Sequence, residues 1–333
     1  MKIDKTLQLP CGVEIKNRFL KSAMTEGIAN SDALSNERHV KLYERWAKGG
    51  TGISITGNVQ IDHRYIERAG NVVIEGTQTN ESLAALANWS QAGKQNNTQL
   101  WMQLSHAGRQ TPFSINKKSV APSVKPMPTL GGVLKFGVPE ELSHTQILDI
   151  IDRFINAAEI AKQTGFTGVQ LHSAHGYLLS EFLSPNINNR TDQWGGSIEN
   201  RSRLLISIID GIRARVGNSF PISIKLNSSD FQKGGFTHEE SIEVAKLLNL
   251  TSLDLLEISG GTYENFAALE IDSFNLKKMK TIKPQRSTVV REAYFLKYAE
   301  EIKKFLSIPL AVTGGFRTAD GMNSALNSGA CDV

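Results

Sequence analysis

The repeated alternation of short apolar strands with amphipathic helices is the feature that most constrains how this chain can fold. Several candidate strands are almost continuously apolar, such as Gly-Ile-Ser-Ile-Thr at 52–56. That composition is typical of strands covered on both faces, as in a parallel sheet wrapped by helices. The predicted strands are residues 19–25, 52–61, 98–105, 168–173, 221–227, 253–259 and 308–313, and an eighth begins at Cys331.

Apolar residues with helical spacing predict helices between these strands. One helix is predicted from Thr145 to a stop at Gly165, and another from Ser197 to a stop at Gly217. Thr237 followed by Glu240 has the spacing of a capping box and opens a third helix.

Strand–helix alternation over a whole chain is compatible with a doubly wound sheet or a closed barrel. No G-x-G-x-x-G turn follows any predicted strand, so the Rossmann phosphate fingerprint is missing. Polar residues and glycines instead follow many different strands, where barrel enzymes build their sites. No linker divides the chain. The sequence therefore predicts an α/β fold, a (β/α)8 TIM barrel, with one domain over residues 1–333.

Three segments lie outside the strand–helix repeat. Residues 7–9 and 13–15 flank Pro10-Cys11-Gly12 and predict an N-terminal β-hairpin that covers the bottom of the barrel. Residues 108–142 hold five of the ten prolines and predict an irregular excursion that forms a lid and a substrate wall. The sequence stops at Val333, so the eighth strand is expected to be cut short and the C-terminal end of the barrel to be missing or truncated.

Composition argues against several other classes of protein. Hydrophobic residues make up 40% and charged residues 21%, which is ordinary for a globular protein. A net charge of +4 is too small to indicate a nucleic-acid surface, and no apolar run approaches the roughly 18 residues of a membrane helix. Cys11 and Cys331 have no paired spacing. We expect a cytoplasmic protein that acts on small molecules, alone or as a homo-oligomer, without nucleic-acid or membrane partners.

The densest group of chemically active side chains follows the strand at 168–173. His172, His175 and Tyr177 are close in sequence there, and imidazoles can donate hydrogen bonds to a carbonyl oxygen while a phenol supplies a proton. The two histidines could alternatively bind a metal, but no third ligand is nearby and we expect none. Tyr177 alone could be a packed aromatic residue.

Two lysines in predicted strands need separate interpretations. Lys225 lies inside an apolar strand, where a lysine is costly unless an anion or acceptor meets it. Lys21 is expected to face outward or to pair with an acid.

Longer motifs resemble those of the old yellow enzyme family of FMN-dependent ene-reductases. The resemblance extends from Leu7 to the last residue. Its most specific stretch is His172-x-x-His175-x-Tyr177-Leu-Leu, then Phe182-Leu-Ser-Pro185, then Asn189-Arg-Thr-Asp-x-x-Gly-Gly-Ser-x-Glu-Asn-Arg201. Similar motifs at other strand ends are residues 17–25, 103–109, 225–227, 260–264 and 314–317.

The resemblance implies FMN as cofactor and NADH or NADPH as hydride donor. Thr25 would bond the flavin C4 carbonyl, and Gly314 with Gly315 would bind the phosphate ahead of a helix near Thr318. Lys225 stands where the family usually has arginine, so it keeps the positive charge but not the bidentate fork. The residues so assigned to the cofactor are Ala23, Met24, Thr25, Gly57, Gln103, Lys225, Gly314, Gly315 and Arg317.

The same resemblance implies a reaction. His172 and His175 would hold the carbonyl oxygen of the substrate, and Tyr177 would protonate the α-carbon as hydride from the flavin reaches the β-carbon. The expected activity is reduction of the C=C bond of an α,β-unsaturated carbonyl or nitro compound. Two alternatives stay open: the barrel module of a larger FMN and iron–sulfur enzyme like dienoyl-CoA reductase, or a ligand-binding barrel without turnover.

Overall fold

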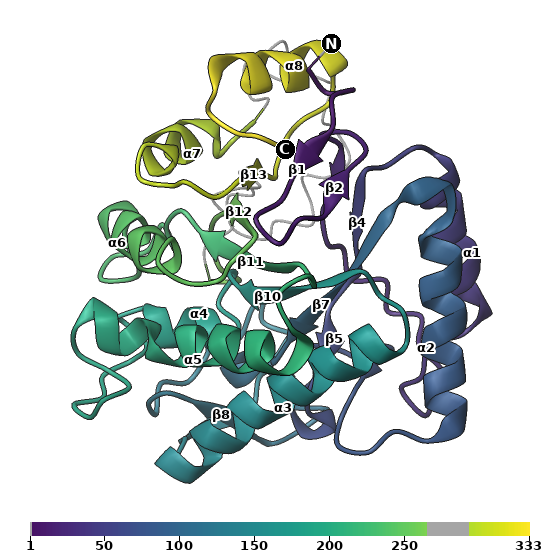
Figure 1. The fold of residues 1–333 in the computed structure, drawn as a ribbon. Helices are drawn as coiled ribbons and strands as arrows, with labels where there is room; N and C mark the ends of the chain where they lie inside the picture. Colours follow the sequence, from purple (N-terminus) through teal and green to yellow (C-terminus); the bar gives the residue numbers. More distant parts are fainter. Residues whose placement is uncertain (1, 265–292) are drawn as a thin grey trace, which may run out of the picture.

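The structure is a computed structural model that describes residues 2–264 and 293–333 (Figure 1). Its centre is a parallel sheet in which strands neighbouring in sequence pair in space, in the order β13-β12-β11-β10-β7-β4-β3. This order is that of a nearly closed barrel, and each strand falls inside a predicted range. The strands are β3 Leu20–Lys21, β4 Ile53–Ile55, β7 Gln99–Ser105, β10 Gly168–Ser173, β11 Ile222–Asn227, β12 Leu255–Ser259 and β13 Leu310–Val312.

The predicted strand at 52–61 is divided in the structure. It forms β4 and a second short strand, β5 Val59–Gln60, which pairs with β7 and with β6 Val72–Val73. Gly57 lies at the break, because its N–H donates to Glu26 Oε1 at 3.1 Å and to the Tyr43 hydroxyl at 3.2 Å rather than to a neighbouring strand. The prediction of one continuous strand was therefore wrong at its centre.

Helices surround the sheet, as Figure 1 shows. The three predicted helices are present: α3 His144–Gln163, α5 Ile198–Val216 and α6 His238–Leu248. Their caps follow the sequence signals, since Gly217 ends α5 and Thr237 forms a capping box with Glu240. The other helices are α1 Glu37–Lys48, α2 Asn80–Gly93, α4 Leu178–Leu183, α7 Leu296–Lys303 and α8 Ala319–Ser328, with 3-10 turns η1 His63–Tyr65, η2 Gln95–Asn97 and η3 Gly108–Gln110.

The barrel has an open seam between β13 and β3, which do not pair within the described ranges. The last residues lie along β13 instead. The N–H groups of Asp332 and Val333 donate to Leu310 O at 2.7 and 3.2 Å. The beginning of the predicted eighth strand thus has the expected neighbour, although residues 331–333 have no regular strand structure.

The N-terminal hairpin is confirmed as the antiparallel pair β1 Leu7–Gln8 and β2 Glu14–Ile15. Leu9 and Ile15 are buried against Ile53 and Leu255, which stand at the amino ends of their strands, so the hairpin covers the bottom of the barrel.

The segment 108–142 is more ordered than predicted. It contains a two-stranded parallel sheet of β8 Lys118–Ala121 and β9 Val138–Glu141, in which the inward residues are buried.

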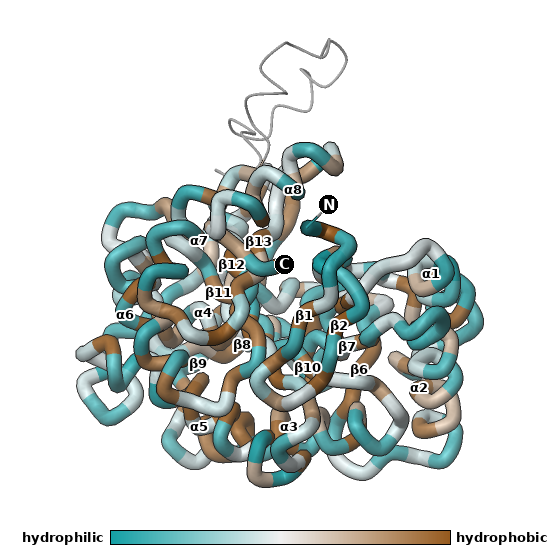
Figure 2. The backbone as a smooth tube through the Cα atoms, turned by 45° about the horizontal axis from the view of Figure 1, so that its top comes forward, coloured by the Kyte–Doolittle hydropathy of each residue, from teal (hydrophilic) through white to brown (hydrophobic). Residues whose placement is uncertain are grey.

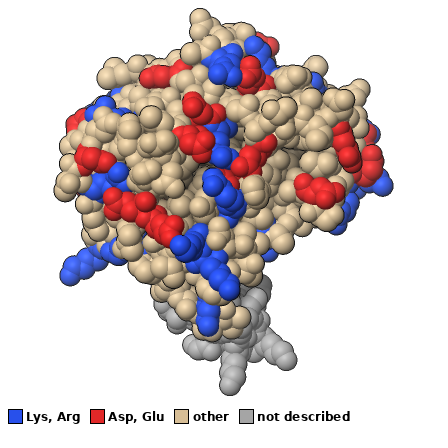
Figure 3. Space-filling model, turned by 90° about the horizontal axis from the view of Figure 1, so that it is seen from below, with Lys and Arg blue, Asp and Glu red and all other residues tan. Residues whose placement is uncertain are grey.

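The hydropathy of the chain follows this architecture. Figure 2 shows apolar strand segments enclosed by helices with many hydrophilic positions. Figure 3 shows Lys and Arg interspersed with Asp and Glu on one face of the molecule. In the described part of the chain, no helix is both long enough and apolar enough to cross a membrane.

Candidate active site

His172, His175 and Tyr177 converge at the carboxyl end of β10. The ring centroid of His172 lies 5.0 Å from that of His175 and 4.7 Å from that of Tyr177. Tyr177 is 3% exposed and forms the N-cap of α4. The loop between β10 and α4 is short, so the strand before it and the helix after it fix the orientation of these side chains.

The backbone of His175 adopts a left-handed conformation with φ of 62°, which is uncommon for a residue other than glycine. Contacts from other strands hold it there. Its N–H donates to Asn227 Oδ1 at 3.1 Å, and its Nε2 lies 2.7 Å from Ser259 Oγ. The ends of β11 and β12 thus determine where this imidazole points.

Both histidines are neutral at neutral pH. Burial lowers the pKa of His172 well below its ordinary value, and the nearby His175 ring and the charge of Lys225 lower it further. Burial and Lys225 lower the pKa of His175 to about 3. His172 Nδ1 accepts a hydrogen bond from the Ala174 N–H at 3.3 Å, so the ring proton is on Nε2, which can donate.

Lys225 meets an anion supplied by the chain itself. Its Nζ lies 2.9 Å from Glu257 Oε1 and donates to Ser22 Oγ at 2.5 Å. The lysine and glutamate side chains are 3% and 0% exposed, and the residues are register partners on β11 and β12. The expectation that an anion or acceptor meets Lys225 is confirmed.

Gln103 belongs to the same interior array. Its Nε2 donates to Gln170 Oε1 at 2.7 Å, and Gln170 Nε2 donates to Glu257 Oε2 at 2.7 Å. Gln103, Gln170, Glu257 and Lys225 therefore form one connected polar chain inside the barrel, contributed by four adjacent strands. The sequence prediction did not identify Gln170 or Glu257. Glu257 could have been identified from the sequence, because it is an acidic residue in an apolar strand that directly follows the apolar strand of Lys225.

The segment after β3 runs beside Gly57. A Cβ atom at Gly57 would lie 2.5 Å from Met24 O, so only glycine allows this close approach. Met24 is exposed and Ala23 half-buried. Thr25 Oγ1 donates to Glu67 Oε2 at 2.9 Å, and a hydroxyl has only one proton to donate.

Lys21 does not follow either expectation. Its ammonium is buried, lies 4.1 Å from the centre of the Trp46 ring, and has no hydrogen-bond partner among the described residues. Burial lowers its pKa to about 8. The ammonium makes a cation–π contact with Trp46 because α1 packs over this part of the sheet, and the charges of Glu26 and Glu257 partly offset the effect of burial on its pKa.

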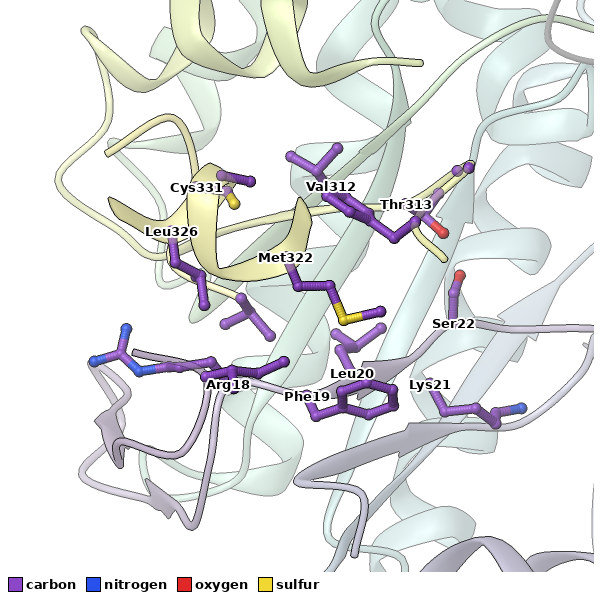
Figure 4. Close-up of a pocket in the computed structure, with 16 residues that line it drawn as sticks. Arg18, Phe19, Leu20, Lys21, Ser22, Val312, Thr313, Met322, Leu326 and Cys331 are labelled. Atoms are coloured by element: carbon purple, nitrogen blue, oxygen red, sulfur yellow. The ribbon is translucent and has the colours of Figure 1, made fainter. Parts of the chain in front are cut away.

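A cavity of about 290 Å³ opens at the seam between β3 and β13 (Figure 4). Its wall includes Ser22, Gly314 and Gly315. The two glycines have φ of 109° and 81°, and the turn leads to Thr318, the N-cap of α8. Arg317 is exposed and directly precedes that cap. A glycine turn ahead of a helix N-terminus suits an anionic group such as phosphate. Tyr177 and His172 do not line this cavity.

Two residues that the sequence left without a role complete the site. The Tyr177 hydroxyl lies 2.7 Å from the Tyr263 hydroxyl, which donates to Glu67 Oε1 at 3.2 Å. Asn58 Nδ2 donates to Glu67 Oε2 at 2.7 Å. Tyr263 belonged to a recognised motif, whereas a single glutamate after η1 carried no sequence signal.

The phenol of Tyr177 keeps its proton over the ordinary pH range. Burial raises its pKa well above the usual value, and the nearby charge of Glu67 raises it further. At neutral pH the neighbouring imidazoles of His172 and His175 are uncharged and can donate hydrogen bonds. The cluster therefore offers hydrogen-bond donors and one transferable proton, with no positive charge on the imidazoles.

One further cluster has the donor atoms of a metal site. Ligand atoms of Asp62, His63 and Glu75 lie within 4.8 Å of one another. Guanidinium groups already bind both carboxylates, since Arg64 pairs with Asp62 and Arg153 with Glu75. The expectation that the protein has no metal site stays a prediction.

We expect stability to fall as the pH rises through neutrality, because of Glu181. Burial raises the pKa of this carboxyl from 4.5 to about 8. Between those values the folded state binds more protons than the unfolded chain, so the loss by pH 9 is up to about 4 kcal/mol. Glu181→Gln should remove this slope in urea unfolding measured from pH 5 to 9.

The matched control for this variant is Glu243→Gln on the exposed face of α6, where the carboxylate pairs with Lys246 at 2.7 Å. It should keep the slope of the unmodified protein. Equal slopes in all three proteins would contradict the assignment to Glu181.

The barrel and its site define a class, the flavin-dependent barrel oxidoreductases. Residues 7–333 match the sequence model of the NADH:flavin oxidoreductase / NADH oxidase family, and the chain belongs to that family, which includes the old yellow enzymes. Flavin is its cofactor, with a nicotinamide as hydride donor.

Three known proteins illustrate the range of relatives. NADH-dependent flavin oxidoreductase iliE of Hypocrea jecorina is 35% identical over 98% of this chain and 83% of its own length. Cinnamate reductase of Clostridium sporogenes is 30% identical over 96% of this chain and 48% of its own length. A solved 2-naphthoyl-CoA reductase complex superposes with a TM-score of 0.86 at 26% identity, covering 100% of this chain and 49% of that one. This chain thus spans about half the length of cinnamate reductase and of 2-naphthoyl-CoA reductase.

Proposed function

We propose that this protein reduces the C=C bond of α,β-unsaturated carbonyl or nitro compounds with hydride taken from NADH or NADPH. The observation that carries the proposal is the meeting of two neutral imidazoles with the protonated phenol of Tyr177 in one buried cluster. A hydride donor alone does not reduce such an alkene: the carbonyl must be polarised and the α-carbon must receive a proton.

Residues from two regions of the structure would hold a bound flavin. Gly314 and Gly315 would hold the phosphate, with Arg317 beside them at the cavity rim. Lys225 and Gln103 would face the ring from the barrel interior. Thr25, at the carboxyl end of β3, would contact the ring without donating its proton, which goes to Glu67. When bound, FMN supplies the hydride. The backbone of Ala23, Met24 and Gly57 would form the remaining wall.

His172 and His175 bind and orient the substrate in this proposal. Their N–H groups would donate to its carbonyl or nitro oxygen, where negative charge develops as hydride arrives. Because the site is buried and the donors are fixed by Ala174 and Ser259, they stabilise that charge without reorganising. The Lys225 charge is largely neutralised by Glu257, so the histidines carry this role.

Conjugated alkenes next to a carbonyl are the substrate class we favour. The relatives named for cinnamate and for 2-naphthoyl-CoA support this choice, because both names describe unsaturated acids or thioesters. We expect purified protein to bind FMN and to be yellow, to be bleached anaerobically by NADH, and to regain its colour with cyclohexenone. Protein that binds no FMN, or that is not reoxidised by any enone, would overturn the proposal.

A second candidate is the barrel module of a longer flavin and iron–sulfur enzyme. The favouring observation is that the chain spans about half of cinnamate reductase and of 2-naphthoyl-CoA reductase. Intact mass and iron content of the natural protein separate the two candidates. Because the family is one of oxidoreductases, a barrel without turnover is not favoured.

A further inference from the structure

We propose that Glu67 and Tyr263 form the path by which a proton returns from solvent to Tyr177 after each turnover. The inference rests on the proposed function, in which Tyr177 gives its proton to the substrate. It assigns a role to a carboxylate and a phenol that come from two separate loops of the barrel.

The three side chains form an unbroken hydrogen-bonded chain. Tyr177 and Tyr263 hydroxyls are 2.7 Å apart, and Tyr263 donates to Glu67 Oε1 at 3.2 Å. The other oxygen of Glu67 accepts from Thr25 and Asn58 at 2.9 and 2.7 Å. Because three side chains donate to the carboxylate, it is held in place beside Tyr263.

Burial decreases along the chain in the direction of solvent. Tyr177 is buried, whereas Tyr263 and Glu67 are both half-buried. The chain therefore connects the closed substrate side of the site with the surface beyond η1. Because Tyr177 is only 3% exposed, water has little direct access to it, and the half-buried Glu67 is the end of the hydrogen-bonded chain that solvent reaches.

The proton balance of the step is simple. Tyr177 loses its phenolic proton to the α-carbon and becomes a phenolate. That phenolate takes the proton of Tyr263, and the Glu67 carboxylate takes a proton from water or buffer and passes it to the oxygen of Tyr263, which returns Glu67 to a carboxylate. One O–H bond breaks and one forms at each transfer, so the net change is one solvent proton delivered to Tyr177.

The direction of transfer follows from the groups around the phenol. The pKa of the Tyr177 hydroxyl is raised well above its ordinary value, so its phenolate is a strong base and draws a proton inward. The charges that face the chain are those of Glu67 and of Arg68, which acts on Tyr263. His172 is neutral, and its donor is reserved for the substrate oxygen.

The decisive variant is Glu67→Gln, which keeps an acceptor for Tyr263 but cannot pass a proton. Three rates are measured on the FMN-loaded protein: flavin reduction by NADH, one reoxidation of pre-reduced flavin by cyclohexenone, and steady-state turnover. The first reoxidation uses the proton already on Tyr177, so it should be undiminished. Steady-state turnover should fall about ten-fold or more below the rate that the two half-reactions allow.

Glu75→Gln is the matched control, because Glu75 lies on the same connection between β5 and α2 but pairs with Arg153 and His63. All three of its rates should equal those of the unmodified protein. Tyr263→Phe interrupts the same path at its middle and should reproduce the Glu67→Gln pattern. It also serves if Glu67→Gln does not fold.

The outcomes separate the two proposals. If Glu67→Gln and Tyr263→Phe both sustain steady-state turnover at the rate of the half-reactions, the proton path is refuted while the ene-reductase proposal stands. A variant that slows the first reoxidation would also refute it, because the residue would then act in the chemical step. If no enone reoxidises the unmodified enzyme, the proposed function itself fails.

Discussion

Replacing Tyr177 by phenylalanine should slow reoxidation of the reduced flavin by an enone about 10²- to 10⁴-fold, the range typical of a lost general acid. Flavin reduction by NADH should change little, because that half-reaction needs no proton from Tyr177. The ring keeps its packing against His172, so the fold should be retained. Anaerobic stopped-flow absorbance of the flavin measures the two half-reactions separately.

Tyr65→Phe is the matched control for this variant. Tyr65 is an aromatic residue of η1 whose ring packs against His106, and its hydroxyl takes no part in the hydrogen bonds of Tyr177. Removal of its hydroxyl should leave both half-reactions unchanged. Equal reoxidation rates for Tyr177→Phe and the unmodified enzyme would remove Tyr177 from the role of proton donor.

Replacing Lys225 by methionine should lower the free energy of unfolding by about 3–5 kcal/mol, because it leaves the Glu257 carboxylate buried without its cation. The two side chains are almost fully buried and 2.9 Å apart. Ser22 and Gln170 still donate to the carboxylate, but both are neutral. Urea unfolding of the FMN-loaded protein measures the change.

The double variant Lys225→Met with Glu257→Gln tests the cause of that loss. Most of the lost stability should return, since no unpaired charge then remains inside the barrel. Lys246→Met on exposed α6 removes a lysine from a solvent-exposed pair and should shift stability by less than about 1 kcal/mol. A single Lys225→Met variant as stable as the parent would show that the buried pair contributes nothing.

Local sequence signals predicted the elements of this fold well. The capping box at Thr237 and the stop at Gly217 fix helix ends by hydrogen bonds within a few residues, so they can be recognised without tertiary information. The apolar strands are recognised because the barrel covers both of their faces. The break at Gly57 was missed because distant partners, Glu26 and Tyr43, take its N–H.

The candidate site also contains some residues that local sequence predicts and others that only tertiary packing places. The motif around His172 and Tyr177 is local and could be recognised directly. The burial of Lys21 against Trp46 could not, because the helix that covers it follows 16 residues after the strand and its placement depends on packing. The order within 108–142 was also missed, since β8 and β9 pair only after the intervening chain has turned back.

The sequence by itself determined the alternation of strands and helices, their caps, the family and the histidine–tyrosine motif, because these depend on residues close together in the chain. Only the tertiary structure decided that Glu67 meets Tyr263, 196 residues away, and that Lys225 lies between Glu257 and Ser22, the latter 203 residues distant. Such contacts depend on the register of parallel strands and the paths of their loops. Parallel strand ends meet at one rim of the barrel, where side chains from many loops share a site.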